Sequence, residues 1–291
     1  MISRPFGLNF DVWAEPYLAV SNGQSFALYY LCFMAKKRPL ILVCNDDGIF
    51  APGIQALIDA VLPLGDILVV APDSPQSGMG HAITINATLR VNQIKHDLDF
   101  PKYSCTGTPV DCIKVAVSHL AQRPIDLIVS GINHGSNSSI NVIYSGTMSA
   151  AVEGCIEGIP SIGFSLCDYS YDADFQPAIP YVQHLTKQVL QNGLPKGVCL
   201  NVNIPGPDKG PIKGVEVCRQ ARAQWVEELD ERVDPRGGKY FWLTGVFKNM
   251  DQGKDTDEHA LANGYISLVP VQIDITAYEA IPEISQWNLQ P

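Results

Sequence analysis

The sequence lacks several patterns that would point directly to a function. Its eight cysteines include no Cys-x-x-Cys pair, so neither a zinc site nor a disulfide framework is indicated. They are scattered, several of them inside apolar runs, which is typical of buried free thiols in a reducing compartment. Glycine-rich turns occur, but none continues into the Lys-Ser/Thr of a P-loop or has the spacing of a dinucleotide-binding fingerprint.

Basic residues are scarce compared with acidic ones. The chain has 20 Lys and Arg against 30 Asp and Glu, a formal net charge of −10. This balance argues against a duplex nucleic-acid partner, because such proteins need a basic face to replace the phosphate counterions. A small anionic substrate stays compatible with the composition if a metal ion supplies local positive charge.

The start of the chain has no hydrophobic run long enough to span a membrane. The longest run in the first 38 residues covers 26–34, whereas a bilayer needs about 20 residues. The basic cluster Lys36-Lys37-Arg38 follows this run, while a signal peptide carries its charges in front. We therefore expect no membrane partner. We expect residues 1–37 to be an extension outside the fold, with Met34 as a candidate alternative start.

Strand-like and helix-like segments alternate along most of the chain. With 291 residues, 46% of them hydrophobic, the chain can bury a substantial core. The alternation predicts an α/β fold, a Rossmann-like, mostly parallel sheet flanked by helices. The expected strands cover 40–44, 67–71, 125–130, 161–166 and 198–204, the expected helices start near 54, 109, 148 and 178, and residues 82–95 read as an exposed hairpin or edge segment.

The last part of the chain has strand-like segments but lacks the regular alternation of strands and helices. From about residue 212, strand-like segments at 215–222, 239–244 and 264–274 are separated by charged or glycine-rich stretches. We expect one domain over 38–291, with its core over about 38–211 and β-rich hairpin arms or a subdomain over 212–291. The arms are expected to make subunit contacts and to cover the site.

The first strand ends in an unusual turn. Five apolar residues, Leu40–Cys44, are followed by Asn45, Asp46, Asp47 and Gly48. Two adjacent like charges are costly unless they are solvated or neutralised, and open α/β sheets bind ligands at the carboxyl ends of their strands. A cation site is one interpretation. A solvated Asp-Asp turn is the other, because Asp and Gly are ordinary turn residues.

Other polar residues follow the next strands and belong to the same edge of the predicted sheet. Ser77 follows the second strand and Asn133 the third. Together with Asp46 and Asp47 they offer only oxygen donors, which select a hard cation such as Mg²⁺, Mn²⁺ or Ca²⁺ over zinc or copper. Taken singly, Ser77 and Asn133 also fit ordinary turns and caps, so that reading stays open.

Two glycine-rich turns precede helix N-termini and suit a phosphate. Gly107-Thr108 and Ser145-Gly146-Thr147 would present free backbone N–H groups and the positive end of a helix dipole. Both turns also fit simple helix caps. His81 and His134 lie beside these loops, and an isolated histidine can be structural or catalytic. A cation facing an anion pocket indicates phosphoryl chemistry.

Many of these segments also occur, in order, as family motifs. They are Asn45-Asp46-Asp47-Gly48, Ala71-Pro72-Asp73, Gln76-Ser77-Gly78, Thr106–Asp111, Ser130–Asn133, Tyr144–Thr147, Gly158–Ser161, Asn201–Pro205, Thr256-Asp257 and Gly264–Ser267. Together they resemble the SurE family of survival-protein nucleotidases over roughly residues 38–276. Two departures, Val110 in place of the usual alanine and the N-terminal extension, do not touch the motif acids.

The resemblance implies a specific activity and assembly. It implies a cytoplasmic, divalent-cation-dependent 5′/3′-nucleotidase, with Mg²⁺ or Mn²⁺ as the expected cofactor, nucleotides as substrates and polyphosphate as a further candidate. It also implies homodimers or homotetramers built with exchanged C-terminal elements. The family's metal ligands fall on Asp46, Asp47, Ser77 and Asn133.

We expect in-line hydrolysis of a phosphomonoester. Asp46 and Asp47 would hold a cation that polarises a phosphoryl oxygen and lowers the pKa of a bound water. The phosphate is expected to bind at Asn45, Gly107, Thr108, Ser145, Gly146 and Thr147. Two alternatives stay open: an aspartyl-phosphate mechanism as in haloacid-dehalogenase-like enzymes, which however carry Asp-x-Asp, and a nucleotide-binding regulatory module without hydrolysis.

Overall fold

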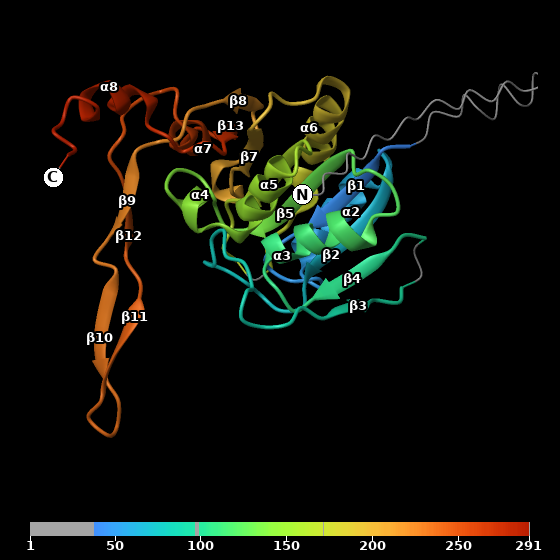
Figure 1. Ribbon diagram of the computed structural model, residues 1–291, viewed down its shortest axis with the longest axis horizontal. Coiled ribbons are helices and arrows are strands. Elements are labelled where there is room, and N and C mark those ends of the chain that lie inside the picture. The colour runs from blue at the N-terminus through green and yellow to red at the C-terminus, as the bar shows by residue number, and fades with distance from the viewer. Residues whose placement is uncertain (1–37, 97–98, 171, 291) are drawn as a thin grey trace, which may run out of the picture. The chain divides into compact units, whose positions relative to one another are not determined.

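A nine-stranded sheet with the order β3-β4-β2-β1-β5-β6-β7-β13-β8 forms the core (Figure 1). The computed structural model describes residues 38–96, 99–170 and 172–290, so the predicted extension at 1–37 lies outside the described residues. The central strands run parallel, which confirms the predicted Rossmann-like α/β class. They are β4 (Lys102–Cys105), β2 (Asp66–Pro72), β1 (Leu40–Cys44), β5 (Leu127–His134), β6 (Ser161–Leu166) and β7 (Val198–Ile204).

Strand β1 is buried on both faces, as its apolar run predicts. Ile41 and Val43 pack into one hydrophobic cluster with helices α2 (Pro52–Val61) and α6 (Ile179–Asn192). Leu42 and Cys44 pack into another, on the opposite face. Helix α3 (Pro109–Val115), its π-helical continuation Ala116–Leu120 and helix α5 (Gly146–Ile156) cover that second face. Helices on both faces are what a parallel sheet requires.

The strand order reverses beside β1. From β1 the chain passes to β2 and β4 on one side, and it then returns to β5, which pairs with β1 on the other side. Cys44 at the end of β1 lies opposite Ser130 in β5. In doubly wound sheets, ligands bind in the crevice outside the carboxyl ends of the strands at such a switch point. The acid pair Asp46-Asp47 leaves β1 at this point.

The segment 82–95 was predicted from its alternating pattern as an exposed hairpin or edge. Only β3 (Val91–Gln93) is a strand, and it forms one edge of the sheet, antiparallel to β4. Residues 82–90 have no strand structure. Their polar groups bond elsewhere: Thr84 bonds to the Asp111 carboxylate and Ala82 accepts from Thr108. Hydrogen bonds to the N-terminal cap of α3 therefore take the place of the strand pairing that the alternating pattern suggested.

The C-terminal region contains the predicted antiparallel hairpins, but it also extends the core. Strand β13 (Ile266–Gln272) pairs antiparallel with β7, and β8 (Val215–Val217) pairs with β13. The remaining strands form two ribbons (orange in Figure 1). These are β9 (Ala223–Val226) with β12 (Val246–Asn249), and β10 (Leu229–Val233) with β11 (Lys239–Leu243). Arms thus account for only part of the range 212–291.

Short helices complete the described chain. They are α4 (Asn141–Tyr144), α7 (Asp257–Ala262), α8 (Ile281–Ile284) and 3-10 turns at Gln176–Ala178, Pro207–Lys209 and Tyr278–Ala280. Within the described residues, no helix is both long and apolar enough to cross a membrane. The cysteines of the described part are free; Cys167 is half-buried and the rest are buried.

Candidate active site

The acid pair lies where β1 meets the switch point. Asp46 is buried, with 4% of its surface exposed, and Asp47 is half-buried. The turn is held by the Asn45 side-chain amide, which donates to the Gly48 carbonyl at 2.9 Å. Gly48 has a φ of +103°, a conformation that glycine adopts at little cost. The turn therefore directs two carboxylates away from the end of a rigid strand.

Burial changes the acid strength of this pair. Burial raises the pKa of Asp46 to about 6; the Thr147 hydroxyl bond opposes the shift and the Asp47 charge adds to it. Burial also raises the pKa of Asp47, opposed by the backbone N–H of His134, which donates to Asp47 Oδ2 at 3.2 Å. The charged forms of both acids lack the solvation that water would give them. A cation at this point would offset that loss.

The N-terminus of α5 meets Asp46 directly. Ser145 is the helix cap, and its hydroxyl accepts from the Met148 N–H at 3.0 Å. The Thr147 hydroxyl donates to Asp46 Oδ1. Gly146 leaves no room for a larger residue, because a Cβ there would lie 2.6 Å from the Asp46 Cβ. First-turn N–H groups of a helix have no partner within the helix, so α5 offers donors for an anion beside Asp46.

Asn133 reaches the same edge from β5, but not from a loop as predicted. Strand β5 continues through Asn133 to His134 after a register shift between Ser130 and Asn133. The Asn133 side chain is 9% exposed and its amide donates to the Gly135 carbonyl at 2.8 Å. This bond uses the amide nitrogen, and the amide oxygen is the atom that a hard cation would bind. The next residue, His134, bonds to Asp47, so Asn133 adjoins the acid pair.

Ser77 approaches from the loop after β2. The Gln76 N–H donates to the Asp46 carbonyl at 2.8 Å, which ties this loop to the β1 turn. The Ser77 side chain is exposed. Three elements thus bring the predicted ligands to the switch point. The turn after β1 carries Asp46 and Asp47, the loop after β2 carries Ser77, and the end of β5 carries Asn133. Their predicted role as ligands stays a prediction.

The residues present fit a hard cation. Asn45 Oδ1 is a buried acceptor with no hydrogen-bond partner, and an unsatisfied buried acceptor at a site with two acids suits a cation or a ligand donor. The described residues contain no group of three or more His, Cys, Asp or Glu that could hold a metal. A site here would thus use two carboxylates with neutral hydroxyl and amide oxygens, the donors that Mg²⁺ and Mn²⁺ accept.

The second predicted anion turn also caps a helix, and its predicted role in binding phosphate stays a prediction. Gly107 and Thr108 lie between β4 and α3, two strands away from β1. Thr108 forms a capping box with Asp111, and its hydroxyl donates to the Ala82 carbonyl at 2.7 Å. A Cβ on Gly107 would lie 2.6 Å from Asp111 Oδ2 and from Leu89 Cδ2. The polar atoms of Thr108 are thus engaged in the helix cap.

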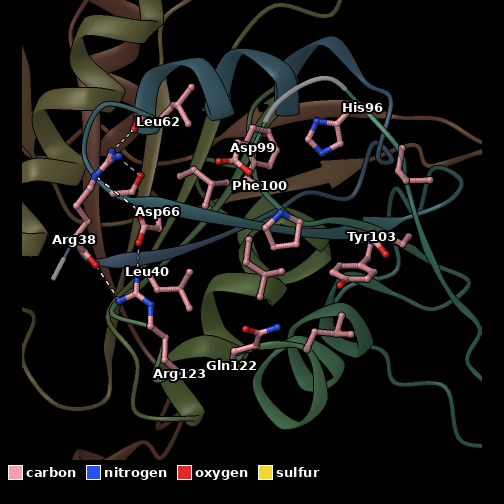
Figure 2. Close-up of a pocket in the computed structure, with 18 of the residues that line it drawn as sticks. Arg38, Leu40, Leu62, Asp66, His96, Asp99, Phe100, Tyr103, Gln122 and Arg123 are labelled. Atoms are coloured by element: carbon pink, nitrogen blue, oxygen red, sulfur yellow. Dashed lines mark hydrogen bonds and ion pairs between the residues drawn. The ribbon is translucent and has the colours of Figure 1, made fainter.

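A cavity of about 1000 Å³ lies elsewhere, at the amino ends of the strands (Figure 2). Arg38 lines it and donates to the carbonyls of Leu62 and Gly65 at 2.8 and 2.9 Å. Arg123 also lines it, and it donates to Asp66 at 2.7 Å. Both guanidinium groups therefore hold the strand starts together. Because α/β sheets bind substrates at the opposite edge, the candidate site is the β1–β5 crevice.

Comparison with known proteins identifies the family. The family model described as survival protein SurE matches residues 41–227. The chain belongs to the SurE family. The 5′-nucleotidase SurE of Christiangramia forsetii is 62% identical over 258 residues, covering 88% of this chain and 99% of the relative. The 5′-nucleotidase SurE of Flavobacterium psychrophilum is 59% identical over 254 residues, covering 87% of this chain and 99% of the relative. The crystal structure of the SurE protein from Aquifex aeolicus has a TM-score of 0.72 and 38% identity, over 85% of this chain and 98% of that one.

The SurE membership predicted from the motifs is thus confirmed. The two histidines beside the site differ in their surroundings in this SurE-family chain. His81 Nε2 bonds to Glu153 Oε2 at 2.9 Å. The His134 ring meets Phe175 edge-on at 5.9 Å between ring centroids, and His134 Nε2 is buried without a hydrogen-bond partner.

Sequence reasoning missed a buried polar network behind Asn133. The Asn137 N–H donates to Asn203 Oδ1 and the Asn201 amide donates to the Asn137 carbonyl, both at 2.8 Å. Asn203 in turn donates to Asn201 at 2.9 Å. The network ties the loop after β5 to strand β7. Its signal was present as two asparagines in an otherwise apolar strand, a placement that needs buried partners.

Proposed function

We propose that this SurE-family chain is a divalent-metal-dependent 5′-nucleotidase that hydrolyses nucleoside monophosphates to nucleoside and phosphate. The proposal also includes 3′-monophosphates and polyphosphate as substrates. The observation that carries it is the contact between Asp46 and the first turn of α5. A carboxylate that could bind a cation thus lies beside helix N–H groups that could bind a phosphate. The names and identities of the curated relatives support the 5′-nucleotidase activity.

The four proposed ligands are Asp46, Asp47, Ser77 and Asn133, with Mg²⁺ or Mn²⁺ as the cation. When bound, the cation would polarise a phosphoryl oxygen and lower the pKa of a water molecule. The Thr147 hydroxyl orients one Asp46 oxygen, and the His134 N–H orients Asp47. Fixed carboxylates of this kind keep the charge where the reaction needs it.

The phosphate is proposed to bind at the start of α5. The backbone N–H groups of Gly146 and Thr147 suit the oxygens of the transferred phosphoryl group, aided by the helix dipole. The missing side chain of Gly146 lets that group approach Asp46 closely. Positioning next to fixed donors is the main protein contribution to phosphoryl transfer. Ser145 contributes by capping the helix, and Asn45 by holding the β1 turn.

A phosphate-release screen tests the proposal. The full chain is assayed with nucleoside 5′- and 3′-monophosphates and with polyphosphate, each in Mg²⁺, Mn²⁺, Co²⁺ or excess EDTA. We expect release from 5′-monophosphates with a divalent ion and none in EDTA. Full activity in EDTA would refute the metal dependence. Nucleotide binding without release would favour a regulatory module, and a trapped phosphorylated Asp46 or Asp47 would favour the aspartyl-phosphate mechanism.

We further propose that the chain self-associates as a dimer or tetramer through its C-terminal ribbons. Tyr240, Phe241, Trp242 and Leu243 are consecutive residues of β11 and each is at least 41% exposed. Because successive residues of a strand point to opposite sides, both faces of this ribbon carry exposed apolar side chains. An isolated two-stranded ribbon is marginally stable in water, so a second copy supports it.

We place the activity in the cytoplasm, and the free thiols of the described cysteines support a reducing compartment.

A further inference from the structure

Ser77 differs from the other proposed ligands in how it is held. Asp46 and Asn133 are buried on strand ends, whereas Ser77 is exposed on a loop. On its N-terminal side the loop is tied by the Gln76 N–H to the Asp46 carbonyl at 2.8 Å. On its C-terminal side follows Gly78, with a φ of +76° and no heavy atom within 4 Å of a Cβ built there. Packing around Gly78 therefore cannot fix Ser77.

The loop is next anchored at Gly80 and His81. The Gly80 N–H donates to the Tyr144 carbonyl at 3.1 Å, just before the cap of α5. His81 Nε2 donates to Glu153 Oε2 at 2.9 Å, and His81 is the first residue after Ser77 whose side chain makes such a bond to α5. Ser77 thus lies between an anchor on the β1 turn and two later anchors, the Gly80 N–H on Tyr144 of α4 and the His81 side chain on Glu153 of α5.

Glu153 is an unusual anchor because it is a buried carboxylate. Only 3% of its side chain is exposed, and a buried charge is retained where it is paired. Lys114 of α3 pairs with the other oxygen, Oε1. Lys114 supplies a counter-charge at Oε1, and His81 bonds to Oε2. The His81 bond therefore fixes the position of the loop in addition to satisfying an oxygen.

The same helix controls both sides of the proposed cation site. At its first turn, Thr147 bonds to Asp46. Six residues later, Glu153 bonds to His81, about 9 Å further along the helix axis at 1.5 Å per residue. Helix α5 thus acts as a rigid spacer between Asp46 and the Ser77 loop.

We propose that His81 and Glu153 are positioning residues that place the Ser77 hydroxyl at the cation site. This rests on the proposed function, because it requires Ser77 to be a ligand. Loss of the His81–Glu153 bond weakens cation binding about 10- to 100-fold, as loss of a residue that orients a metal ligand does. Turnover with saturating cation changes little, because His81 does not touch the reacting groups.

The test measures Mn²⁺ binding to the full chain without substrate, with free Mn²⁺ read by electron paramagnetic resonance. The variants are His81→Ala, His81→Gln, Ser77→Ala and the double variant Ser77→Ala/His81→Ala. We expect His81→Ala to raise the Mn²⁺ dissociation constant about 10- to 100-fold. His81→Gln keeps an N–H donor for Glu153 and restores most of the affinity. The double variant binds no more weakly than Ser77→Ala, because His81 acts through Ser77.

Two controls separate the possible failures. His119→Ala changes an exposed histidine beyond α3 and leaves Mn²⁺ affinity unchanged. Asp46→Asn abolishes tight Mn²⁺ binding if the cation site is correct. An unaltered affinity in His81→Ala, or additive losses in the double variant, would overturn the positioning role alone. Mn²⁺ binding by Asp46→Asn as tight as wild type, or none by the wild type, would overturn the cation site and the positioning role with it.

Discussion

The carboxyl edge of the sheet buries polar side chains, whereas the β10–β11 ribbon exposes apolar ones; in most proteins polar side chains are exposed and apolar ones are buried. At the sheet edge, polar residues such as Asn45, Asp46 and Asn133 are at most 9% exposed. In the ribbon, Phe241 and Trp242 are 53% and 59% exposed. Buried polar groups without partners and exposed apolar side chains both raise the free energy of the isolated protein. In the proposed function, a cation completes the first region and a second copy of the chain completes the second.

The two regions need different completion. Asn45 Oδ1 and His134 Nε2 are buried without hydrogen-bond partners, so the sheet edge calls for polar or charged ligands. The ribbon exposes Leu243 at 76%, so it calls for apolar surface. The hydrophobic clusters of the protomer lie on the two faces of the main sheet and include Phe164 and Ile128, which are fully buried. Function at one region should be separable from assembly at the other.

The largest expected effect is on catalysis at the sheet edge. Asp46→Asn removes a proposed cation ligand, and nucleotidase activity should fall at least about 1000-fold. This loss is larger than the 10- to 100-fold loss that is typical when a residue that only hydrogen-bonds to a metal ligand is replaced. Phosphate release from a nucleoside 5′-monophosphate in saturating Mn²⁺ measures it. The oligomeric state should not change. Retention of even a tenth of the wild-type rate would contradict the role given to Asp46.

A pair of phenylalanines sharpens the comparison in terms of stability. Phe164→Ala in β6 empties a fully buried position, and it should lower the free energy of unfolding by about 3 to 5 kcal/mol. Phe241→Ala in β11 removes a side chain that is 53% exposed, and it should change protomer stability by about 0.5 kcal/mol or less. Urea unfolding of dilute protein gives both values. Similar losses for the two variants would show that the ribbon is part of the protomer core.

The ribbon itself is tested through self-association. Trp242→Ala should weaken association by about 2 kcal/mol or more, as large aromatic residues at the centre of an interface do. Sedimentation equilibrium over a range of concentrations measures this. Ile156→Ala removes another exposed apolar side chain, at the end of α5, and should leave association unchanged. An unchanged assembly in Trp242→Ala, or an equal loss in Ile156→Ala, would assign self-association to another surface.

Local patterns explain what could be predicted from the sequence. The apolar run of β1, the Thr108 and Ser145 caps and the proline at the start of α3 depend on neighbours within a few residues, and the structure contains each of them. The convergence of the strand ends followed from the parallel topology. The acid pair was found for the same reason, since it directly follows a strand buried on both faces.

Long-range pairing explains what could not be predicted. Strand β5 continues to His134 because β6 pairs with it beyond the register shift, and no local signal marks that. β13 joined the main sheet through β7, although its sequence reads like that of the arms. Glu153 resembles any acid on a helix in the sequence; only the fold brings Lys114 and His81 to it.

The last prediction concerns pH and the same sheet edge without a cation. The folded protein holds the pKa of Asp46 near 6, against an ordinary value of 3.8. Between these values the folded state binds more protons than the unfolded state, so the free energy of unfolding falls as the pH rises. In EDTA, wild type should lose on the order of 1 to 3 kcal/mol from pH 4 to pH 7 relative to Asp46→Asn. Urea unfolding of both proteins at each pH measures the difference. Added Mn²⁺ should restore the lost stability at pH 7 for wild type alone, because a cation stabilises the charged carboxylate that burial penalises. Parallel pH profiles of the two proteins in EDTA would contradict the raised pKa of Asp46. They would also contradict the proposal that this edge needs a cation.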